Sequence, residues 1–238
     1  MELKNKRFAF FIQALFFLLI NLGFDLIDRA IGLKGYLYNF SKIILIAVLI
    51  SLLNKKGEKY FSKFNAKYLV FVAISFVFTF LMCYSETVFK GKYFDFASNL
   101  LFIIITIVLE ELFFRSYAYN FFEENGVISL SNSLYVIIVF TICNLPIFFF
   151  ETASLSALSI IFLLALDTYI FGIFLSSKNL LICVVCSFFV LATKTYFDFY
   201  SVSGLLVSNT LLYVIYILAI FTLISIGSIF IMRNTVRK

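Results

Sequence analysis

Residues 96–117 read FASNLLFIIITIVLEELFFRSY. The part before Glu110 carries no charge, and the run is closed by two adjacent carboxylates, Glu110 and Glu111, and by Arg115. An uncharged apolar run of this kind predicts a helix in apolar surroundings, and ionisable groups inside or beside such a helix are costly and therefore candidates for function. We expect the chain to form membrane helices, with its chemistry near this motif.

The composition of the whole chain agrees with this expectation. Of its 238 residues, 63% are hydrophobic and 13% are charged, and the mean hydropathy is +1.07. A soluble domain is about half apolar and a quarter charged. These values exclude a soluble enzyme, a secreted disulfide module and a disordered tail. The net charge of +6 is not gathered into a stripe, which excludes a nucleic-acid-binding protein.

Apolar runs of membrane-spanning length recur along the chain, separated by short polar breaks. A spanning helix needs about 20 mostly apolar residues. The pattern predicts an all-α, polytopic transmembrane bundle that forms one membrane-embedded domain over residues 1–238. The eight expected spans are Phe8–Phe24, Tyr36–Leu53, Tyr68–Tyr84, Phe96–Phe114, Leu130–Phe150, Leu155–Leu175, Leu180–Tyr200 and Leu205–Met232.

The distribution of basic residues predicts the orientation of these spans. With both termini on the cytoplasmic side, 13 of the 19 Lys and Arg residues fall in inside segments, as the positive-inside rule requires. The most basic loop, Asn54–Lys67, either lies along the anionic inner leaflet or, as is more common, only marks the inner side of the membrane. The chain is therefore expected in the cell membrane, in contact with the lipid bilayer.

The motif itself contains an ion pair and a second carboxylate. Four residues separate Glu111 from Arg115, so on a helix they share a face, whereas Glu110 points about 100° away from Glu111. One carboxylate can be held by the guanidinium while the other faces a cavity. The alternative interpretation is an ordinary ion pair at a cytoplasmic helix end.

Two further places put polar groups in apolar runs. Asn144, in the fifth run, needs a hydrogen-bonding partner in hydrocarbon, either Glu110 or Glu111; a role in holding helices together is the more common one. Asp167 in the sixth run and Lys194 in the seventh are expected to neutralise each other, with an ion pathway as the alternative.

Cysteine and histidine usage argues against a bound metal or cofactor. Cys83, Cys143, Cys183 and Cys186 all lie in apolar runs, which favours buried thiols over disulfides. Without histidine or a second thiol pair, the C-x-x-C formed by the last two is expected to pack rather than to bind zinc.

The E-E-x-x-x-R motif formed by Glu110, Glu111 and Arg115 resembles that of the CPBP family, the CAAX-processing and bacteriocin-associated intramembrane proteases, also called the Abi family. The resemblance covers about residues 96–200. The family's second motif, F-x-x-x-H, is half present, with Phe140 matched and Asn144 at the histidine position. The histidine of its third motif would fall near Cys186 or Ser187.

The resemblance implies roles for these residues. Glu110 would be the base that activates water, Glu111 and Arg115 would orient it, and Asn144 would take one stabilising position. Because asparagine cannot exchange a proton near neutral pH, a site without histidine is most simply a protease scaffold that has lost its chemistry. We therefore expect a catalytically weakened or silent protein that binds or regulates another membrane or cell-envelope protein.

Two other functions remain as alternatives. One is an active glutamate-dependent intramembrane endopeptidase, of CAAX or bacteriocin processing or immunity type, in which Glu110 aided by Asn144 suffices for a slow reaction. The other is a small transporter that uses Asp167 and Lys194. The chain lacks a pair of Gly/Pro-broken helices in corresponding halves, which is the usual sign of a transporter site.

Overall fold

The structure of the protein is a computed structural model that describes residues 3–32, 36–54, 66–83, 93–152, 157–196 and 210–235. Side chains are described throughout these ranges except at 3, 78–83, 93–99, 146–152, 157–159, 190–196, 210–213 and 215–216.

The described chain is helical and contains no strand. Its one β-type contact, between Glu124 and Val127, closes the turn between two helices. The helical segments are α1 (Leu3–Ile31), α2 (Tyr36–Asn54), η1 (Ala66–Tyr68), α3 (Leu69–Cys83), α4 (Tyr93–Glu111), η2 (Leu112–Tyr117), α5 (Ala118–Phe122), α6 (Leu130–Thr152), α7 (Ala157–Ser177), α8 (Leu180–Tyr196) and α10 (Thr210–Thr235).

The described part of each apolar run is helical, so the all-α prediction is confirmed for the described residues. Among the described residues, four helices are long and apolar enough to cross a membrane, half the number of spans expected from the sequence. They are Lys4–Ile31, Tyr36–Asn54, Ile160–Ser177 and Ile217–Thr235. Three shorter apolar helices accompany them: Ala66–Val77, Leu130–Leu145 and Leu180–Phe189.

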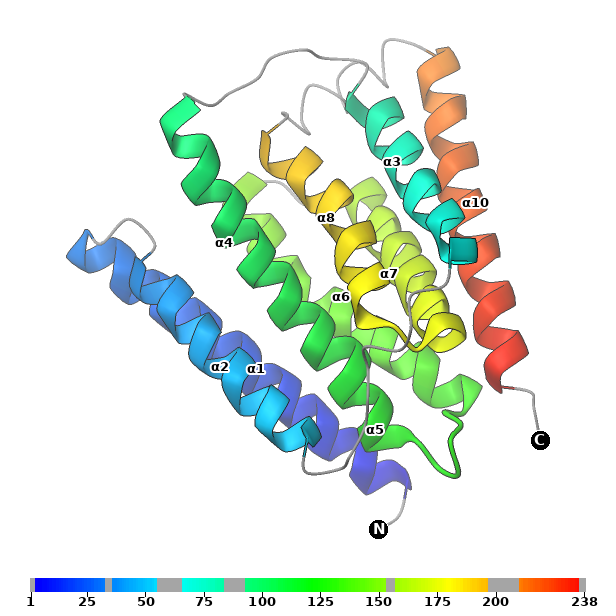
Figure 1. The fold of residues 1–238 in the computed structure, drawn as a ribbon, viewed down its shortest axis with the longest axis horizontal. Helices are drawn as coiled ribbons and strands as arrows, with labels where there is room; N and C mark the ends of the chain where they lie inside the picture. Colours follow the sequence, from blue (N-terminus) through cyan, green and yellow to red (C-terminus); the bar gives the residue numbers. More distant parts are fainter. Residues whose placement is uncertain are drawn as a thin grey trace.

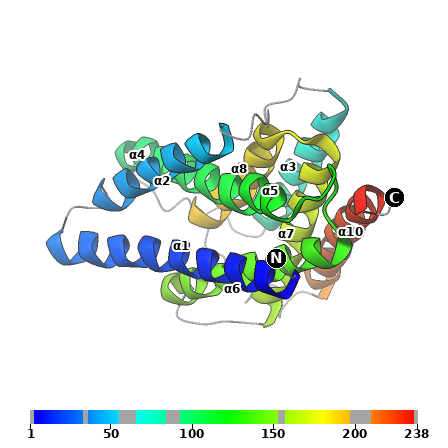
Figure 2. The same cartoon turned by 90° about the horizontal axis from the view of Figure 1, so that it is seen from below.

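The helices form a bundle with the motif-bearing helix inside it (Figure 1). The hairpin of α1 and α2 lies on one side and α3 and α10 on the other, while α4, α6, α7 and α8 fill the space between. Seen from below, α1 and α6 lie on one side of the bundle and α2, α4 and α8 on the opposite side (Figure 2). Helix α4 packs against both α2 and α8.

Helices α7 and α10 pack in close contact, and two glycines permit this approach. A Cβ atom on Gly172 would lie 2.6 Å from the backbone oxygen of Gly227, and one on Gly227 would collide with the backbone of Thr168. Small residues at a helix crossing let two backbones come into contact, which is the usual packing device of membrane helices.

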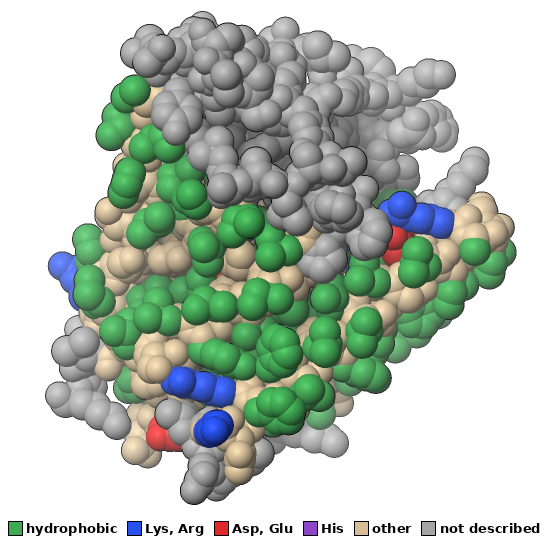
Figure 3. All heavy atoms as spheres, turned by 180° about the vertical axis from the view of Figure 1, so that it is seen from behind, with side chains coloured by type: hydrophobic (Ala, Val, Ile, Leu, Met, Phe, Trp, Pro, Cys, Tyr) green, Lys and Arg blue, Asp and Glu red, His purple; other side chains and the backbone are tan. Residues whose placement is uncertain are grey.

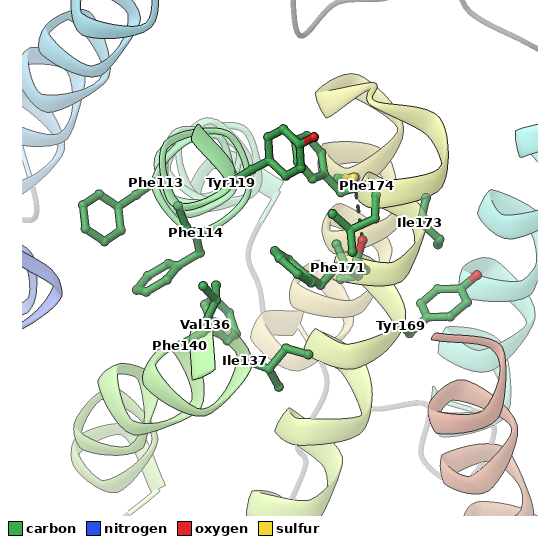
Figure 4. Packing of buried hydrophobic residues seen from close by; sticks show 14 of the residues in the cluster. Phe113, Phe114, Tyr119, Val136, Ile137, Phe140, Tyr169, Phe171, Ile173 and Phe174 are labelled. Atoms are coloured by element: carbon green, nitrogen blue, oxygen red, sulfur yellow. Dashed lines mark hydrogen bonds between the residues drawn. The ribbon is translucent and has the colours of Figure 1, made fainter. Parts of the chain in front are cut away.

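Aromatic side chains dominate the core around the motif. Phe113 stacks on Phe17 of α1 at 4.5 Å between ring centroids, and Phe114 meets Phe140 of α6 edge to face at 4.9 Å. Figure 4 shows Phe114, Phe140 and Phe171 gathered between η2, α6 and α7. Because these rings fill the space between the helices, a polar group placed there is shielded from water.

The outer surface is also apolar. Large hydrophobic side chains cover the described part of the face seen in Figure 3, and the charged groups visible there lie near its margins. Phe16, Leu26 and Phe40 on the α1–α2 hairpin are each about 60% exposed. An exposed apolar surface of this extent, on helices of spanning length, indicates residence in a lipid bilayer.

Candidate functional site

The E-E-x-x-x-R motif lies where α4 passes into a π-helical turn. From the sequence, the helix was expected to end at the motif. In the structure it continues through η2 into α5. The backbone N–H of Ala118 bonds the carbonyl oxygen of Phe113, five residues earlier. A π turn inserts one residue into a helix and re-aims the following side chains, and such turns are frequent at functional sites. Arg115 lies in this turn.

Glu111 and Arg115 form the ion pair expected from their spacing, inside the bundle. Arg115 Nε lies 3.3 Å from Glu111 Oε2, and the two side chains are 1% and 4% exposed. Ser187 of α8 donates a hydrogen bond of 2.7 Å to the other carboxylate oxygen of Glu111. The Glu111 carboxylate is thus bound from both sides, by α8 and by the π turn.

Arg115 also forms a second ion pair that the sequence did not reveal. Its Nη2 atom donates to Oδ1 of Asp167 on α7, and the Asp167 side chain is completely buried. The expectation that Asp167 pairs with Lys194 gives way to this pairing with Arg115. The side chain of Lys194 lies outside the described residues.

Aromatic rings complete the surroundings of the guanidinium. Arg115 Cζ lies 5.0 Å from the ring centroid of Phe140 and 5.6 Å from that of Phe171, within the range of cation–π attraction. These contacts join η2 to α6 and α7, where the same two rings are seen in Figure 4.

We call Glu111, Arg115, Asp167 and Ser187 the buried polar cluster. It joins α4, η2, α7 and α8, and each of its four residues is at most 3% exposed. In so dry a place, the removal of one member of an ion pair leaves an uncompensated charge, which costs about 3–5 kcal/mol. The cluster can therefore hold four elements in one arrangement.

Glu110 faces a different part of the bundle, as the helical geometry predicts. It lines a small, partly enclosed cavity whose interior has room for about one water molecule. Asn144 lines the same cavity, so Glu110 on α4 and Asn144 on α6 face a common space. Glu111 and Arg115 do not line this cavity and belong to the buried polar cluster. The cavity is lined by Phe17, Leu18, Asn21, Tyr38, Lys42, Thr106, Leu109, Glu110, Phe114, Cys143 and Asn144.

The hydrogen bond of Asn144 differs from the expectation. Its Nδ2 atom donates to the backbone oxygen of Phe140, one turn earlier in α6, at 3.1 Å. This bond stays within α6 and uses one of the two N–H groups of the amide. Asn144 is therefore a cavity-lining residue whose described bond goes neither to Glu110 nor to Glu111.

The wall of this cavity also carries a buried cation. Lys42 of α2 is 3% exposed, its Nζ atom donates to Thr106 Oγ1 at 2.6 Å, and it lies 3.7 Å from the ring centroid of Tyr38. Lys42 lies within the expected span Tyr36–Leu53 and was not singled out from the sequence. Its position inside a long apolar run was the signal that marked it as buried.

The cysteines with described side chains are packing residues. Cys143, Cys183 and Cys186 are buried free thiols, and Cys183 Sγ lies 3.5 Å from the backbone oxygen of Asn179 as a weak donor. The side chain of Cys83 lies outside the described residues. Within the described part of the chain, no group of three or more Cys, Asp and Glu side chains could hold a metal ion.

Comparison of the chain with models of protein families, with curated proteins and with solved structures found no match.

Proposed function

We propose that this chain is an eight-pass cell-membrane protein of the CPBP type whose protease-like site is weakened or silent, and which binds or regulates another membrane or cell-envelope protein. The observation that supports the proposal is that the two adjacent glutamates have different surroundings. Glu111 is occupied by Arg115 and Ser187 in the buried polar cluster, while Glu110 shares a cavity with Asn144.

The chemistry of this cavity supports binding rather than hydrolysis. A water-activating glutamate needs preorganised donors for the charge that develops on the substrate carbonyl, and the loss of one such donor lowers the rate by about 10²–10³. The chain has no histidine, and one of the two N–H groups of the Asn144 amide bonds the backbone oxygen of Phe140. Ser187, near which the histidine of the third CPBP motif would fall if the resemblance holds, donates to Glu111 instead.

The alternative of an active endopeptidase is favoured by one observation. Glu110 and Asn144 line the same cavity, which is what a slow glutamate-dependent reaction would need. The two functions differ in a direct assay: the purified protein, reconstituted in liposomes, is incubated with a mixture of hydrophobic membrane peptides, and products are detected by mass spectrometry. We expect no cleavage above that of Glu110→Gln. Cleavage that Glu110→Gln abolishes would establish the endopeptidase.

The proposed partner can be sought at the exposed face of α1. A photo-crosslinking residue replaces Leu19, which is 57% exposed near the cavity-lining part of α1, and a matched variant carries it at Phe221 on α10, which is 63% exposed. We expect a discrete protein adduct from position 19 alone. The same products from both positions, or adducts with lipid only, would contradict a specific partner at this face.

The proposed orientation places both termini in the cytoplasm. The described cations Lys6 and Arg7 at the start of α1, Lys178 after α7 and Arg233 near the end of α10 agree with the positive-inside rule for that orientation. Protease treatment of right-side-out membranes tests it with epitope tags at each terminus. Both tags should be protected until the membrane is permeabilised, and cleavage of either in sealed membranes would contradict it.

A further inference from the structure

The cavity beside Glu110 is lined by a hydrogen-bond acceptor that no described residue satisfies. Asn21 of α1 lines this cavity and is 6% exposed. Its Nδ2 atom donates to the backbone oxygen of Phe17 at 2.8 Å, which fixes the orientation of the amide. The other atom, Oδ1, is buried and accepts no hydrogen bond from any described residue. Buried polar atoms are almost always bonded to protein or to ordered water, so this acceptor indicates a bound donor.

The size and the lining of the cavity indicate that the donor is a single water molecule. The interior has room for about one water, which excludes a larger guest. A buried water also needs about two to four polar partners. Besides Asn21, the polar side chains that line this space are Tyr38, Lys42, Thr106, Glu110 and Asn144. The cavity therefore meets both requirements of a hydration site.

The chemistry of the lining residues indicates how this water is oriented. A water molecule donates two hydrogen bonds, and Asn21 Oδ1 accepts one of them. Glu110 is the acidic residue among the lining side chains, and an ionised acceptor forms the stronger hydrogen bond. The Asn144 amide has a second N–H group besides the one that bonds Phe140. This N–H group is a donor for the water oxygen.

We propose that the cavity binds one water molecule, which donates one hydrogen to Asn21 Oδ1 and the other to the Glu110 carboxylate and accepts a hydrogen bond from Asn144. Asn21 is then a positioning residue. It belongs to α1, outside the CPBP-like motifs, and holds the water beside Glu110. The inference concerns the cavity of the proposed function, but the water is bound whether the site is silent or active.

The test is X-ray hydroxyl-radical labelling of the full chain in lipid nanodiscs, with peptide mass spectrometry. X-rays convert a bound water into a radical that oxidises the side chains around it, even where these are buried. Phe114 lines the cavity and is 1% exposed, while Phe122 is equally buried and does not line it. We expect oxidation of Phe114 and not of Phe122. The rate at which oxygen-18 from labelled solvent enters oxidised Phe114 measures the exchange of the water.

The deciding variant is Asn21→Leu, which removes the acceptor and keeps the approximate shape. Circular dichroism checks that it is folded. The oxidation rate of Phe114 should fall about tenfold, the change in water occupancy that corresponds to the loss of one hydrogen bond. Asn234→Leu is the matched control, because Asn234 makes the same bond to the backbone one turn earlier, to Phe230, on α10. It should leave labelling unchanged.

A second variant, Glu110→Gln, tests the other acceptor without a change of size. It keeps an acceptor oxygen but removes the charge, so its hydrogen bond to the water is weaker. We expect the labelling of Phe114 to persist, while oxygen-18 enters the oxidised product several times faster than in the unmodified protein.

Three results would overturn the proposal. Equal oxidation of Phe114 and Phe122 would mean that no water is bound in the cavity. Unchanged labelling in a folded Asn21→Leu protein would show that Oδ1 is not the acceptor. Unchanged oxygen-18 exchange in Glu110→Gln would show that the carboxylate is not a partner of the water. Each of these results is independent of the peptide cleavage assay, so a failure of the water site and a failure of the proposed function are separate outcomes.

Discussion

Arg115 and Asp167 are 52 residues apart in the sequence and form a completely buried ion pair that joins the π turn to α7. Because Arg115 also pairs with Glu111, one guanidinium lies between two carboxylates. The interaction of Arg115 with both carboxylates makes the buried polar cluster a structural centre of the bundle, and most of the expected effects of mutation follow from it.

Replacement of Arg115 with methionine should be strongly destabilising. The variant keeps most of the side-chain volume but leaves Glu111 and Asp167 buried without their cation, so the free energy of unfolding should fall by about 3–5 kcal/mol. Denaturant titration in micelles measures this change. Arg29→Met is the control, because Arg29 pairs with Asp25 at an exposed position where ion pairs contribute about 1 kcal/mol or less. Equal effects of the two variants would contradict the structural role of Arg115.

The hydrogen bond from Ser187 to Glu111 should make a smaller but measurable contribution. Ser187→Ala removes a donor to a buried charged group, which should lower the free energy of unfolding by about 1.5–3 kcal/mol. Thr222→Ala provides the comparison, since Thr222 is exposed and bonds only the backbone of its own helix at Leu218. Its effect should stay within about 0.5 kcal/mol. A stable Ser187→Ala protein would mean that Glu111 is held by Arg115 alone.

The close approach of α7 and α10 should not tolerate even a methyl group. In Gly172→Ala the new Cβ would lie 2.6 Å from a backbone oxygen of Gly227, and such overpacking costs about 1–3 kcal/mol. Gly23→Ala is the matched change, because nothing lies within 4 Å of its Cβ position in α1. There the higher helix propensity of alanine should be neutral or stabilising. Thermal unfolding of both variants under one condition compares them, and a tolerated Gly172→Ala would mean that the two helices can separate.

Replacing Glu111 or Glu110 with alanine should lower the free energy of unfolding by different amounts. Glu111→Ala leaves Ser187 without its acceptor and removes one of the two carboxylates that bind Arg115, so a loss of about 1–3 kcal/mol is expected. Glu110→Ala alters the wall of the partly enclosed cavity and should lower the free energy of unfolding by less. Denaturant titration of the pair gives the order directly, and the reverse order would assign the structural role to Glu110.

The sequence predicted the helices and the local part of the site, because both depend on neighbouring residues. Apolar runs fix the helices, and a four-residue spacing fixes the Glu111–Arg115 pair. The sequence also indicated that Asp167 is a costly charge in an apolar run. Lys194 was the expected partner, because consecutive helices are often neighbours. The pairing with Arg115 depends on the tertiary arrangement that brings η2 and α7 together, and the π turn that holds Arg115 has no recognisable pattern in LFFRSY.

The cavity shows the same limit. Its walls come from α1, α2, α4, η2 and α6, and no local spacing relates Asn21 or Lys42 to Glu110. A polar residue in an apolar run can be recognised as unusual from the sequence, but its partner depends on the tertiary packing. Asn144 illustrates this point, because its described bond goes to its own helix.

The most direct test of the buried polar cluster is a double-mutant cycle of Arg115→Met and Asp167→Leu, with unfolding free energies measured in micelles. We predict that each single change is strongly destabilising and that the double variant loses less than the sum, with a coupling energy of about 0.5–3 kcal/mol, because it buries no unpaired Asp167 charge. Strictly additive losses would contradict the ion pair as the structural centre of the bundle.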